Sequence, residues 1–302
     1  MAISNRFLAA VVTAVVSVVA VVTTATAAHA DIVTPTTAGP IRTISYNVCG
    51  AHCKSALGLS AWTAAMKREI TAWDADAVML QELCIGQWIS LRDNLPGYKA
   101  VWSATKLEAD GCDQWNKDDK RFGLGVLVKT GNPVDRLVGN LSVPSGEEPR
   151  SILCARGAVD GRTTLACSTH LAQYIRPDNG ASEAMAYVGQ WAGTAPVLIG
   201  ADVNADSFDA TVLGPFRAGA ARTGKFAEVD ENDQDYFSAK CLADGTRECD
   251  TGEGTRPDGR KFDDIFVTTA DFHTVRGDAI EPGLSDHRLL RGAAHPEARP
   301  TN

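Results

Sequence analysis

Polar side chains follow apolar runs at several places in this chain, and their types could do chemistry together. The last of these places is "LSDHRLL", where Asp286 and His287 stand side by side between apolar residues. A carboxylate can hold a divalent cation and an imidazole can move a proton, so the pair suits metal-assisted or acid–base chemistry. Taken alone, the fragment also fits a capped turn in which Ser285 and Asp286 accept backbone N–H groups.

Five further apolar runs carry an acid, an amide or an imidazole at one end. These residues are Asn47, Glu82, His170, Asp202 with Asn204, and Asp263. Each one alone could be a turn former or a solvated strand end. Strand ends at one edge of a sheet sandwich form a rim, and rims carry sites, so we expect the whole set to lie together. Glu82 offers the hard oxygen ligands that suit Mg²⁺.

The elements that must position these residues alternate irregularly between strand and helix. Apolar residues at helical spacing predict a helix over residues 60–73, and shorter helices are expected over 88–95 and 182–191. Strands are expected at "IRTISYNV", "DAVMLQEL", "FGLGVLVKT", "SILCARGAV", "RTTLACSTHL", "APVLIGADVNA", "KFDDIFVTT" and "HRLLRGAA". Because helices separate only some of the strands, the order predicts an α/β (α+β) sandwich with mixed sheets, and neither a barrel nor a doubly wound sheet.

The first thirty residues are typical of a secretory signal peptide. Arg6 is their only charge, residues 7–22 are almost wholly apolar, and Ala28-His29-Ala30 offers a signal-peptidase site. The apolar run is shorter than the ~20 residues that a bilayer needs, so we expect cleavage after Ala30 and not a membrane anchor. Residues 31–40 are then a linker, and residues 41–302 are one large domain of a secreted, extracellular protein.

The charge balance argues against broad electrostatic attraction to nucleic acid or anionic lipid. The chain has 29 Lys and Arg against 37 Asp and Glu, for a formal net charge of −8. Removal of the signal peptide takes away one more positive charge, that of Arg6. Local contacts to phosphate remain compatible with this balance, especially through a bound metal.

All eight cysteines follow residue 30, and an even number in an exported chain indicates disulfides. Asp160-Gly161 predicts a two-residue hairpin, and counting outward from it places Cys154 opposite Cys167 at a non-hydrogen-bonded pair. We therefore predict the bridge Cys154–Cys167, and as a second bridge Cys241–Cys249 around an Asp-Gly loop. The other four, Cys49, Cys53, Cys84 and Cys112, allow three pairings, which stay open.

In chain order, "SYN", "QE", "STHL", "GADVNA", "KFDDIF" and "SDHRLL" resemble the motifs of the endonuclease/exonuclease/phosphatase superfamily, to which deoxyribonuclease I belongs. The resemblance extends over residues 41–292. Its specific part is "GADVN", followed by the first acid of "DDIF" and then by "SDH". It implies a deoxyribonuclease I-like four-layer sandwich, in which two packed mixed β-sheets are flanked by helices. Asp286 and His287 come late because the last strand returns beside the first.

The resemblance also implies a metal site for phosphoester hydrolysis. Asn47 and Asp286 would join Glu82 in holding Mg²⁺, and Mn²⁺ or Ca²⁺ could replace it. One position departs from some relatives, which carry an acid two residues after the asparagine. Here that position is Cys49, so a second metal ligand from this strand is missing, and the number of metals stays open.

Catalytic roles follow from the same resemblance. Asp263 would orient His287 as a carboxylate fixes an imidazole tautomer, and His170 would donate to a phosphoryl oxygen or protonate the leaving group. Asp202 and Asn204 lie two apart on a strand, so they face the same way and would hold the attacking water and the phosphate. The general base stays open between Asp202 and the pair of His287 with Asp263.

Among phosphoester substrates, the sequence favours nucleic acid. We predict a secreted nuclease that acts on DNA, is a monomer and has no stable membrane anchor. Two basic loops could supply the local cations: Lys117, Lys120 and Arg121, and Arg256, Arg260 and Lys261. Arg121 and Lys261 are the predicted substrate contacts. The loops could equally be solvated surface.

Other substrates and one non-enzymatic function remain as alternatives. A sphingomyelinase-like phospholipase C would need an exposed apolar loop, for which Trp102 and Trp115 are the candidates, although core packing suits Trp102 better. A phosphomonoesterase acting on inositol or sugar phosphates could use the same centre. A non-catalytic binding module is disfavoured because the full set of acids, amides and imidazoles is intact.

Overall fold

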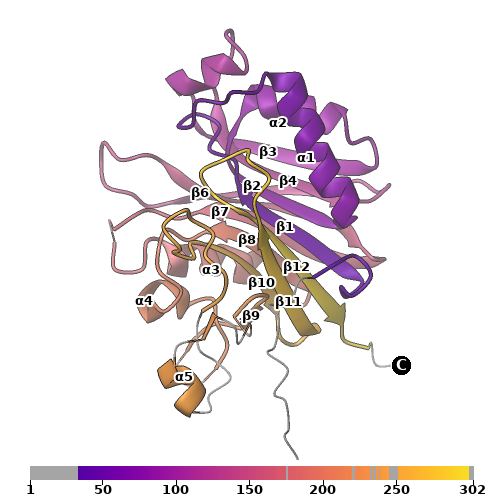
Figure 1. Ribbon diagram of the computed structural model, residues 1–302, viewed down its shortest axis with the longest axis vertical. Coiled ribbons are helices and arrows are strands. Elements are labelled where there is room, and N and C mark those ends of the chain that lie inside the picture. Colours follow the sequence, from indigo (N-terminus) through magenta and orange to yellow (C-terminus); the bar gives the residue numbers. More distant parts are fainter. Residues whose placement is uncertain are drawn as a thin grey trace, which may run out of the picture.

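The computed structural model describes residues 33–298, apart from residues 175, 220–221, 232, 234–235, 238 and 245–250. Within these ranges, twelve strands form two six-stranded mixed sheets (Figure 1). The first sheet has the order β11-β12-β1-β2-β4-β3, with bounds Phe272–Ile280, Leu289–Pro296, Ile41–Asn47, Ala77–Cys84, Phe122–Lys129 and Tyr98–Lys106. The second has the order β5-β6-β7-β8-β10-β9, with bounds Asp135–Leu141, Arg150–Val159, Arg162–His170, Val197–Asp202, Asp263–Thr268 and Phe226–Glu228.

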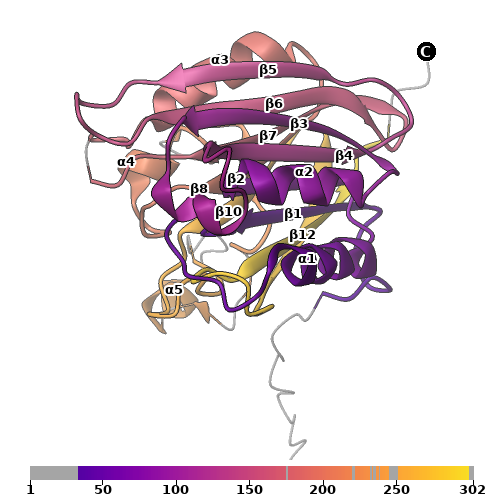
Figure 2. The same cartoon turned by 90° about the horizontal axis from the view of Figure 1, so that it is seen from above.

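Helices cover the two outer faces, which makes four layers (Figures 1 and 2). The first sheet is covered by α1 and α2, and the second by α3 and α4. Their bounds are Leu59–Trp73, Ile85–Asp93, Ala181–Ala192 and Ala210–Leu213; the 3₁₀ helix η1 (Asp110–Gln114) and α5 (Ala239–Asp244) lie in connections. In α1, Trp62, Met66, Ile70 and Trp73 are buried at three- and four-residue spacing, the stripe that docks an amphipathic helix. The predicted sandwich is confirmed.

The four strands that the sequence did not reveal are the four sheet edges. All eight strands expected from apolar runs are present, and they occupy interior positions of the two sheets. The unexpected ones are β3, β5, β9 and β11, the outermost strand on each side. An edge strand is solvated along one side, and its apolar residues alternate with polar and charged ones. Its sequence therefore lacks the continuous apolar run of a central strand.

Two pairs of parallel strands determine at which edge of each sheet the carboxyl ends of the strands meet. β1 runs parallel to β2, with α1 as the crossover, and β7 runs parallel to β8, with α3 between them. The carboxyl ends of each pair therefore meet at one edge of its sheet. β12 and β10 run antiparallel to β1 and β8, so these two strands begin where the others end.

A glycine and a glutamine bring the two sheets close together beneath that edge. A Cβ atom on Gly200 of β8 would lie 2.6 Å from the Met79 Cβ of β2, so only glycine permits this approach. Fully buried Gln81 bridges the sheets, because its Nε2 donates to Ser168 Oγ at 3.1 Å and to the Gly200 carbonyl at 3.3 Å. The strand ends above this point are thereby held within side-chain reach of each other.

Three disulfides join cysteines of the described residues. Cys154 pairs with Cys167 as predicted, and these residues face each other in the β6–β7 ladder with Cα atoms 4.0 Å apart. Of the three open pairings, the structure has Cys49–Cys53 and Cys84–Cys112. The predicted bridge between residues 241 and 249 lies outside the described residues and stays a prediction. In the part of the chain that the structure describes, no helix has the length and apolar character needed to cross a bilayer.

Candidate active site

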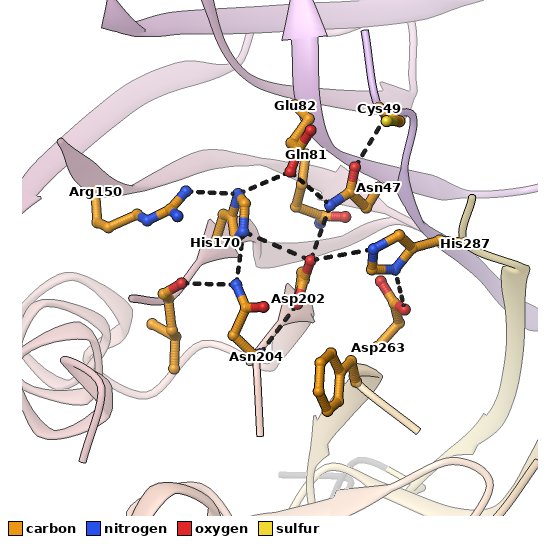
Figure 3. A network of polar contacts seen from close by, with 12 residues as sticks. Asn47, Cys49, Gln81, Glu82, Arg150, His170, Asp202, Asn204, Asp263 and His287 are labelled. Carbon is orange, nitrogen blue, oxygen red and sulfur yellow. Dashed lines mark hydrogen bonds and ion pairs between the residues drawn. The ribbon is translucent and has the colours of Figure 1, made fainter. Parts of the chain in front are cut away.

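The ladder register places three of the expected residues abreast on neighbouring strands. In the second sheet, His170 of β7 pairs with Asp202 of β8, and Asp202 pairs in turn with Asp263 of β10. Residues opposite each other in a ladder point to the same face of the sheet. The first sheet contributes Asn47 from the end of β1 and Glu82 from β2, directly across the sandwich (Figure 3).

Asp202 is the hub of this arrangement (Figure 3). Its Oδ2 accepts a hydrogen bond from Asn47 Nδ2 at 2.8 Å. The same oxygen lies 3.5 Å from Nε2 of His170 and 3.7 Å from Nε2 of His287. A single buried carboxylate oxygen is thus surrounded by one amide and two imidazoles, a concentration of proton donors and acceptors that no core packing requires.

A bulge in β2 aims Glu82 into the site. The β2–β4 register shifts between Leu80 and Leu83, and Glu82 has a φ of +54°, which L-residues rarely adopt. Its Oε1 accepts from Asn47 Nδ2 at 3.1 Å, whereas Oε2 is buried without a hydrogen-bond partner. Burial is the main cause that raises the pKa of Glu82, although the Asn47 hydrogen bond opposes it. A carboxylate in this state lacks a compensating cation.

His287 is held by Asp263, as the sequence predicted. Its Nδ1 lies 2.7 Å from Asp263 Oδ2, whereas neither carboxylate oxygen of the neighbouring Asp264 has a hydrogen-bond partner. Burial alone would lower the pKa of His287, but the charge and hydrogen bond of Asp263, helped by Asp202, outweigh it and raise the pKa to about 9. Arg256 Nη1 lies 2.8 Å from the other nitrogen, Nε2; with the ring protonated, two donors therefore face each other there.

His170 has the opposite electrostatic setting. Burial, then the charge of Arg150, lower its pKa to about 3, so the ring is neutral at neutral pH. Donors face both nitrogens of the ring: Arg150 Nη1 lies 2.9 Å from Nδ1, and the amide nitrogen of Asn204 lies 2.8 Å from Nε2. Glu148 in turn accepts from Arg150. The two imidazoles that flank Asp202 thus differ in charge.

Asn204 completes the side of the site formed by β7 and β8. Its φ of +50° and its backbone N–H, which donates to Asp202 Oδ1 at 3.0 Å, turn its side chain back toward β7. The amide group then lies 2.8 Å from Nε2 of His170 and donates to the Leu171 carbonyl at 3.1 Å. Non-glycine residues with positive φ concentrate where a structure holds side chains for function, and Glu82 and Asn204 both fit that pattern.

Comparison with known proteins places this chain in a family. Residues 44–287 match the model of the Endonuclease/Exonuclease/phosphatase family, which is most of the chain. The chain belongs to this family. No curated protein sequence matches the chain significantly.

Several solved structures share the fold of this chain but have low sequence identity to it. The human Nocturnin catalytic domain, solved with a sulfate anion, has a TM-score of 0.60 at 17% identity, covering 88% of this chain and 96% of that one. A mannosyl-6-phosphatase from Bacteroides thetaiotaomicron has a TM-score of 0.60 at 17% identity, with 84% and 99% covered. TDP2 from D. rerio, complexed with a single-strand DNA product, has 0.57 at 16% identity, with 84% and 98% covered. At these identities the likeness establishes the fold.

Asp286, the remaining residue that the family resemblance assigned to the metal, lies at the border of the site. Its Oδ2 pairs with Arg256 Nη1 at 2.8 Å, and its Oδ1 lies 3.5 Å from Cys53 Sγ. The Cys49–Cys53 bridge therefore occupies the space beside Asp286, and its sulfurs have no thiolate to offer a metal. Ser285 donates to the Asn47 carbonyl at 2.7 Å, which fixes the Asp286 segment against β1.

Lys261 is a correction to the predicted substrate contacts. It is only 4% exposed, and its Nζ lies 3.5 Å from Glu228 Oε1 and 3.3 Å from Asp230 Oδ2. A lysine paired inside a buried acidic cluster is unavailable to substrate. Lys261 is buried because it directly precedes Phe262 and β10, which pack into the core. Arg121 is exposed as expected, but its guanidinium pairs with Asp119 and does not line the catalytic pocket.

Two arginines that line the pocket were not assigned from the sequence as substrate contacts. The pocket has a volume of about 180 Å³, and its lining includes Arg150 beside His170 and Arg256 beside His287. Arg150 had a signal: the hairpin register that pairs Cys154 with Cys167 also brings the start of β6 beside His170 at the end of β7. Arg256 belongs to a basic loop that the sequence indicated, but the sequence alone could not tell which of its basic residues, Arg256 or Lys261, faces the pocket.

Proposed function

We propose that the chain is an exported, divalent-metal-dependent phosphoesterase that hydrolyses phosphodiester bonds, with nucleic acid as the favoured substrate. The observation that carries the proposal is the Asp202 carboxylate, placed between the imidazoles of His170 and His287 and bonded to Asn47. Phosphoryl transfer depends mainly on positioning and on charge stabilisation, and this cluster offers both. Membership of the Endonuclease/Exonuclease/phosphatase family supports the same class of reaction.

Glu82 fits the divalent cation. Its Oε2 is buried and unpartnered, and its carboxylate is costly to ionise without a positive charge nearby. Asn47 lies beside Glu82 and would contribute its carboxamide oxygen if that oxygen, which here accepts from the Cys49 N–H, turned toward the cation. Asp286 would contribute if it left Arg256. Mg²⁺, or Mn²⁺ or Ca²⁺ in its place, would neutralise charge on the phosphoryl oxygens.

The protein's own groups would handle the protons. Asp202 Oδ2 faces the centre and is the carboxylate free to accept a proton from water, because Asp263 is occupied in holding His287. His287 would then donate to a phosphoryl oxygen, and His170, on the other side of Asp202, would donate to a second one or to the leaving group. Asn204 fixes the position of His170 and of the Asp202 carboxylate.

Export of the chain remains part of the proposal. The signal-peptide pattern of residues 1–30 motivates it, and the three disulfides are compatible with an oxidising compartment. We expect cleavage after Ala30, a linker over residues 31–40 and a single catalytic domain from residue 41 onward.

A phosphomonoesterase is the second candidate, and the small pocket favours it. A volume of about 180 Å³ between two arginines suits a compact phosphate group. The sphingomyelinase-like alternative loses its apolar loop, because Trp115 is only 7% exposed and Trp102 packs against the core. An acidic chain can still cleave nucleic acid if a few cations contact the phosphates at the scissile bond.

The test is a parallel substrate screen with the chain that begins at Asp31, folded under oxidising conditions. Plasmid DNA, RNA, sphingomyelin vesicles, inositol phosphates and sugar phosphates are each offered with Mg²⁺ and with EDTA. The proposal expects Mg²⁺-dependent cleavage of DNA or RNA. Release of inorganic phosphate from the small esters with nucleic acid intact would move the assignment to a phosphomonoesterase, and no hydrolysis of any substrate would contradict it.

A further inference from the structure

Arg256 reaches the catalytic centre from a loop that carries no family motif. Its Nη1 lies 2.8 Å from Nε2 of His287 and 2.8 Å from Oδ2 of Asp286. The imidazole nitrogen that it contacts is the one turned toward Asp202. The guanidinium therefore stands at the place where a phosphoryl oxygen must come if His287 is to act on it.

The loop is tied firmly to the strands that carry the site. The backbone N–H groups of Thr255 and Arg256 both donate to the Arg260 carbonyl at 2.9 Å. Buried Thr255 Oγ1 accepts from the backbone N–H of Asp263 at 3.0 Å, and the Thr255 carbonyl accepts from the N–H of Arg288 at 2.7 Å. The base of Arg256 is thus fixed to β10 and to the segment that precedes β12, next to both members of the His287–Asp263 pair.

Arg256 has more donors than the protein uses. A guanidinium carries five N–H donors, and the described contacts of this one are made through Nη1. Its Nε is buried without a hydrogen-bond partner. Arg150, which lines the same pocket, also contacts its partners through Nη1, namely Glu148 and His170. An anion that enters this small pocket therefore meets two guanidinium groups, each beside one of the two histidines.

We propose that Arg256 binds a non-bridging oxygen of the substrate's phosphoryl group beside His287. The inference rests on the proposed function, because it assigns a substrate contact to the same centre. It replaces Lys261, the sequence-based choice from this loop, whose ammonium group is buried in the Glu228–Asp230 cluster. The competing explanation is that Arg256 serves only to neutralise Asp286.

Binding of inorganic phosphate to the metal-free protein separates these explanations without using turnover. The chain from Asp31 is stripped with EDTA, and phosphate is titrated calorimetrically at low ionic strength into the wild type, Arg256→Gln, Arg256→Lys and Arg68→Gln. Arg68 lies on α1 and pairs with the adjacent Glu69, so its change removes the same charge away from the pocket. Thermal unfolding of each variant verifies that it is folded.

We expect Arg256→Gln to weaken phosphate binding by roughly tenfold or more, the usual effect of losing a charge-assisted hydrogen bond. Arg256→Lys should bind with intermediate affinity because it keeps the charge but loses the planar fork, and Arg68→Gln should bind as the wild type does. Equal phosphate affinity of the wild type and Arg256→Gln, or no measurable binding by the wild type, would overturn the inference. A chain that binds phosphate through Arg256 but hydrolyses nothing would sink the proposed function and leave this inference standing.

Discussion

At the scale of single residues, the site contains two histidines that differ in charge. His287 is held by Asp263 with a raised pKa, whereas His170 lies against Arg150 with a lowered one. Groups whose surroundings push their pKa values apart are typical of sites that move protons in a fixed direction. The two rings share one neighbour, the Asp202 carboxylate, so the account assigns the acid and base functions to one compact cluster.

Replacing His287 by alanine tests this assignment. His287→Ala should lower kcat by roughly 10²- to 10⁴-fold, because a positioned proton-transfer group is lost, and the melting temperature should change little. The measurement is initial rate against substrate concentration, with circular dichroism to verify folding. A loss of only a few-fold would rule out the role given to this imidazole.

Glu82→Gln tests the metal site. The amide is nearly isosteric but neutral, so Mg²⁺ should bind more weakly and the Mg²⁺ concentration for half-maximal activity should rise roughly tenfold or more. Calorimetric titration of the metal into the purified protein gives the affinity directly. If the variant binds and uses Mg²⁺ as the wild type does, the cation is held elsewhere.

At the scale of elements, the interior strands were predictable and the edges were not. A strand buried on both faces is a continuous apolar run, and all eight such runs became strands. β3, β5, β9 and β11 are edges whose residues alternate between solvent and core, and this weak pattern escaped detection. The candidate catalytic residues could be predicted as a set because they lie at the ends of interior strands. Arg150 is the first residue of β6 and Arg256 lies in a loop, and neither belongs to a motif that marks it from the sequence.

The β6–β7 hairpin gives an element-scale prediction. Its register followed from the Asp-Gly turn, and the Cys154–Cys167 bridge closes a sequence separation of 13 residues. Replacing both cysteines by alanine should lower the free energy of unfolding by about 2–4 kcal/mol, as measured by urea titration. A reductant should destabilise the wild type more than the double variant. If the wild type and the double variant had equal free energies of unfolding without reductant, the bridge would add nothing to the stability of the fold.

A buried acid beside the site gives a prediction on pH. Burial raises the pKa of Asp264 to about 7, although the charge of Lys261 opposes it, and both carboxylate oxygens lack hydrogen-bond partners. Because the folded-state pKa lies above that of the unfolded chain, ionised Asp264 destabilises the fold. This cost is absent below about pH 4, grows with rising pH and levels off above about pH 7.

Asp264→Asn should therefore raise the free energy of unfolding more at pH 8 than at pH 5, as measured by urea titration at both values. Asp118→Asn, an exposed acid on a loop, is the matched control and should change stability by less than about 0.5 kcal/mol at either pH. A loss of stability in Asp264→Asn at pH 8 would show that the Lys261 charge needs the ionised carboxylate.

At the scale of the whole molecule, two six-stranded sheets are joined so that strand ends from both meet at one place. Gly200 allows the approach and Gln81 links the sheets beneath the site, so the catalytic geometry depends on how the sandwich packs. The molecule is acidic overall, yet three arginines in the lining of its pocket, Arg150, Arg256 and Arg260, concentrate positive charge where a phosphate would bind. We therefore expect these local contacts, and not the net charge, to decide substrate choice.

The most direct test of the account compares phosphoester hydrolysis by the wild type and by Asp202→Asn, each with Mg²⁺ and with EDTA, on the substrate that the screen identifies. The account predicts Mg²⁺-dependent turnover in the wild type and a loss of roughly 10²-fold or more in Asp202→Asn, since the amide cannot accept the proton of the attacking water. Turnover by Asp202→Asn at the wild-type rate, or wild-type turnover that persists unchanged in EDTA, would contradict the central claim that Asp202 is the hub of a metal-dependent phosphoesterase.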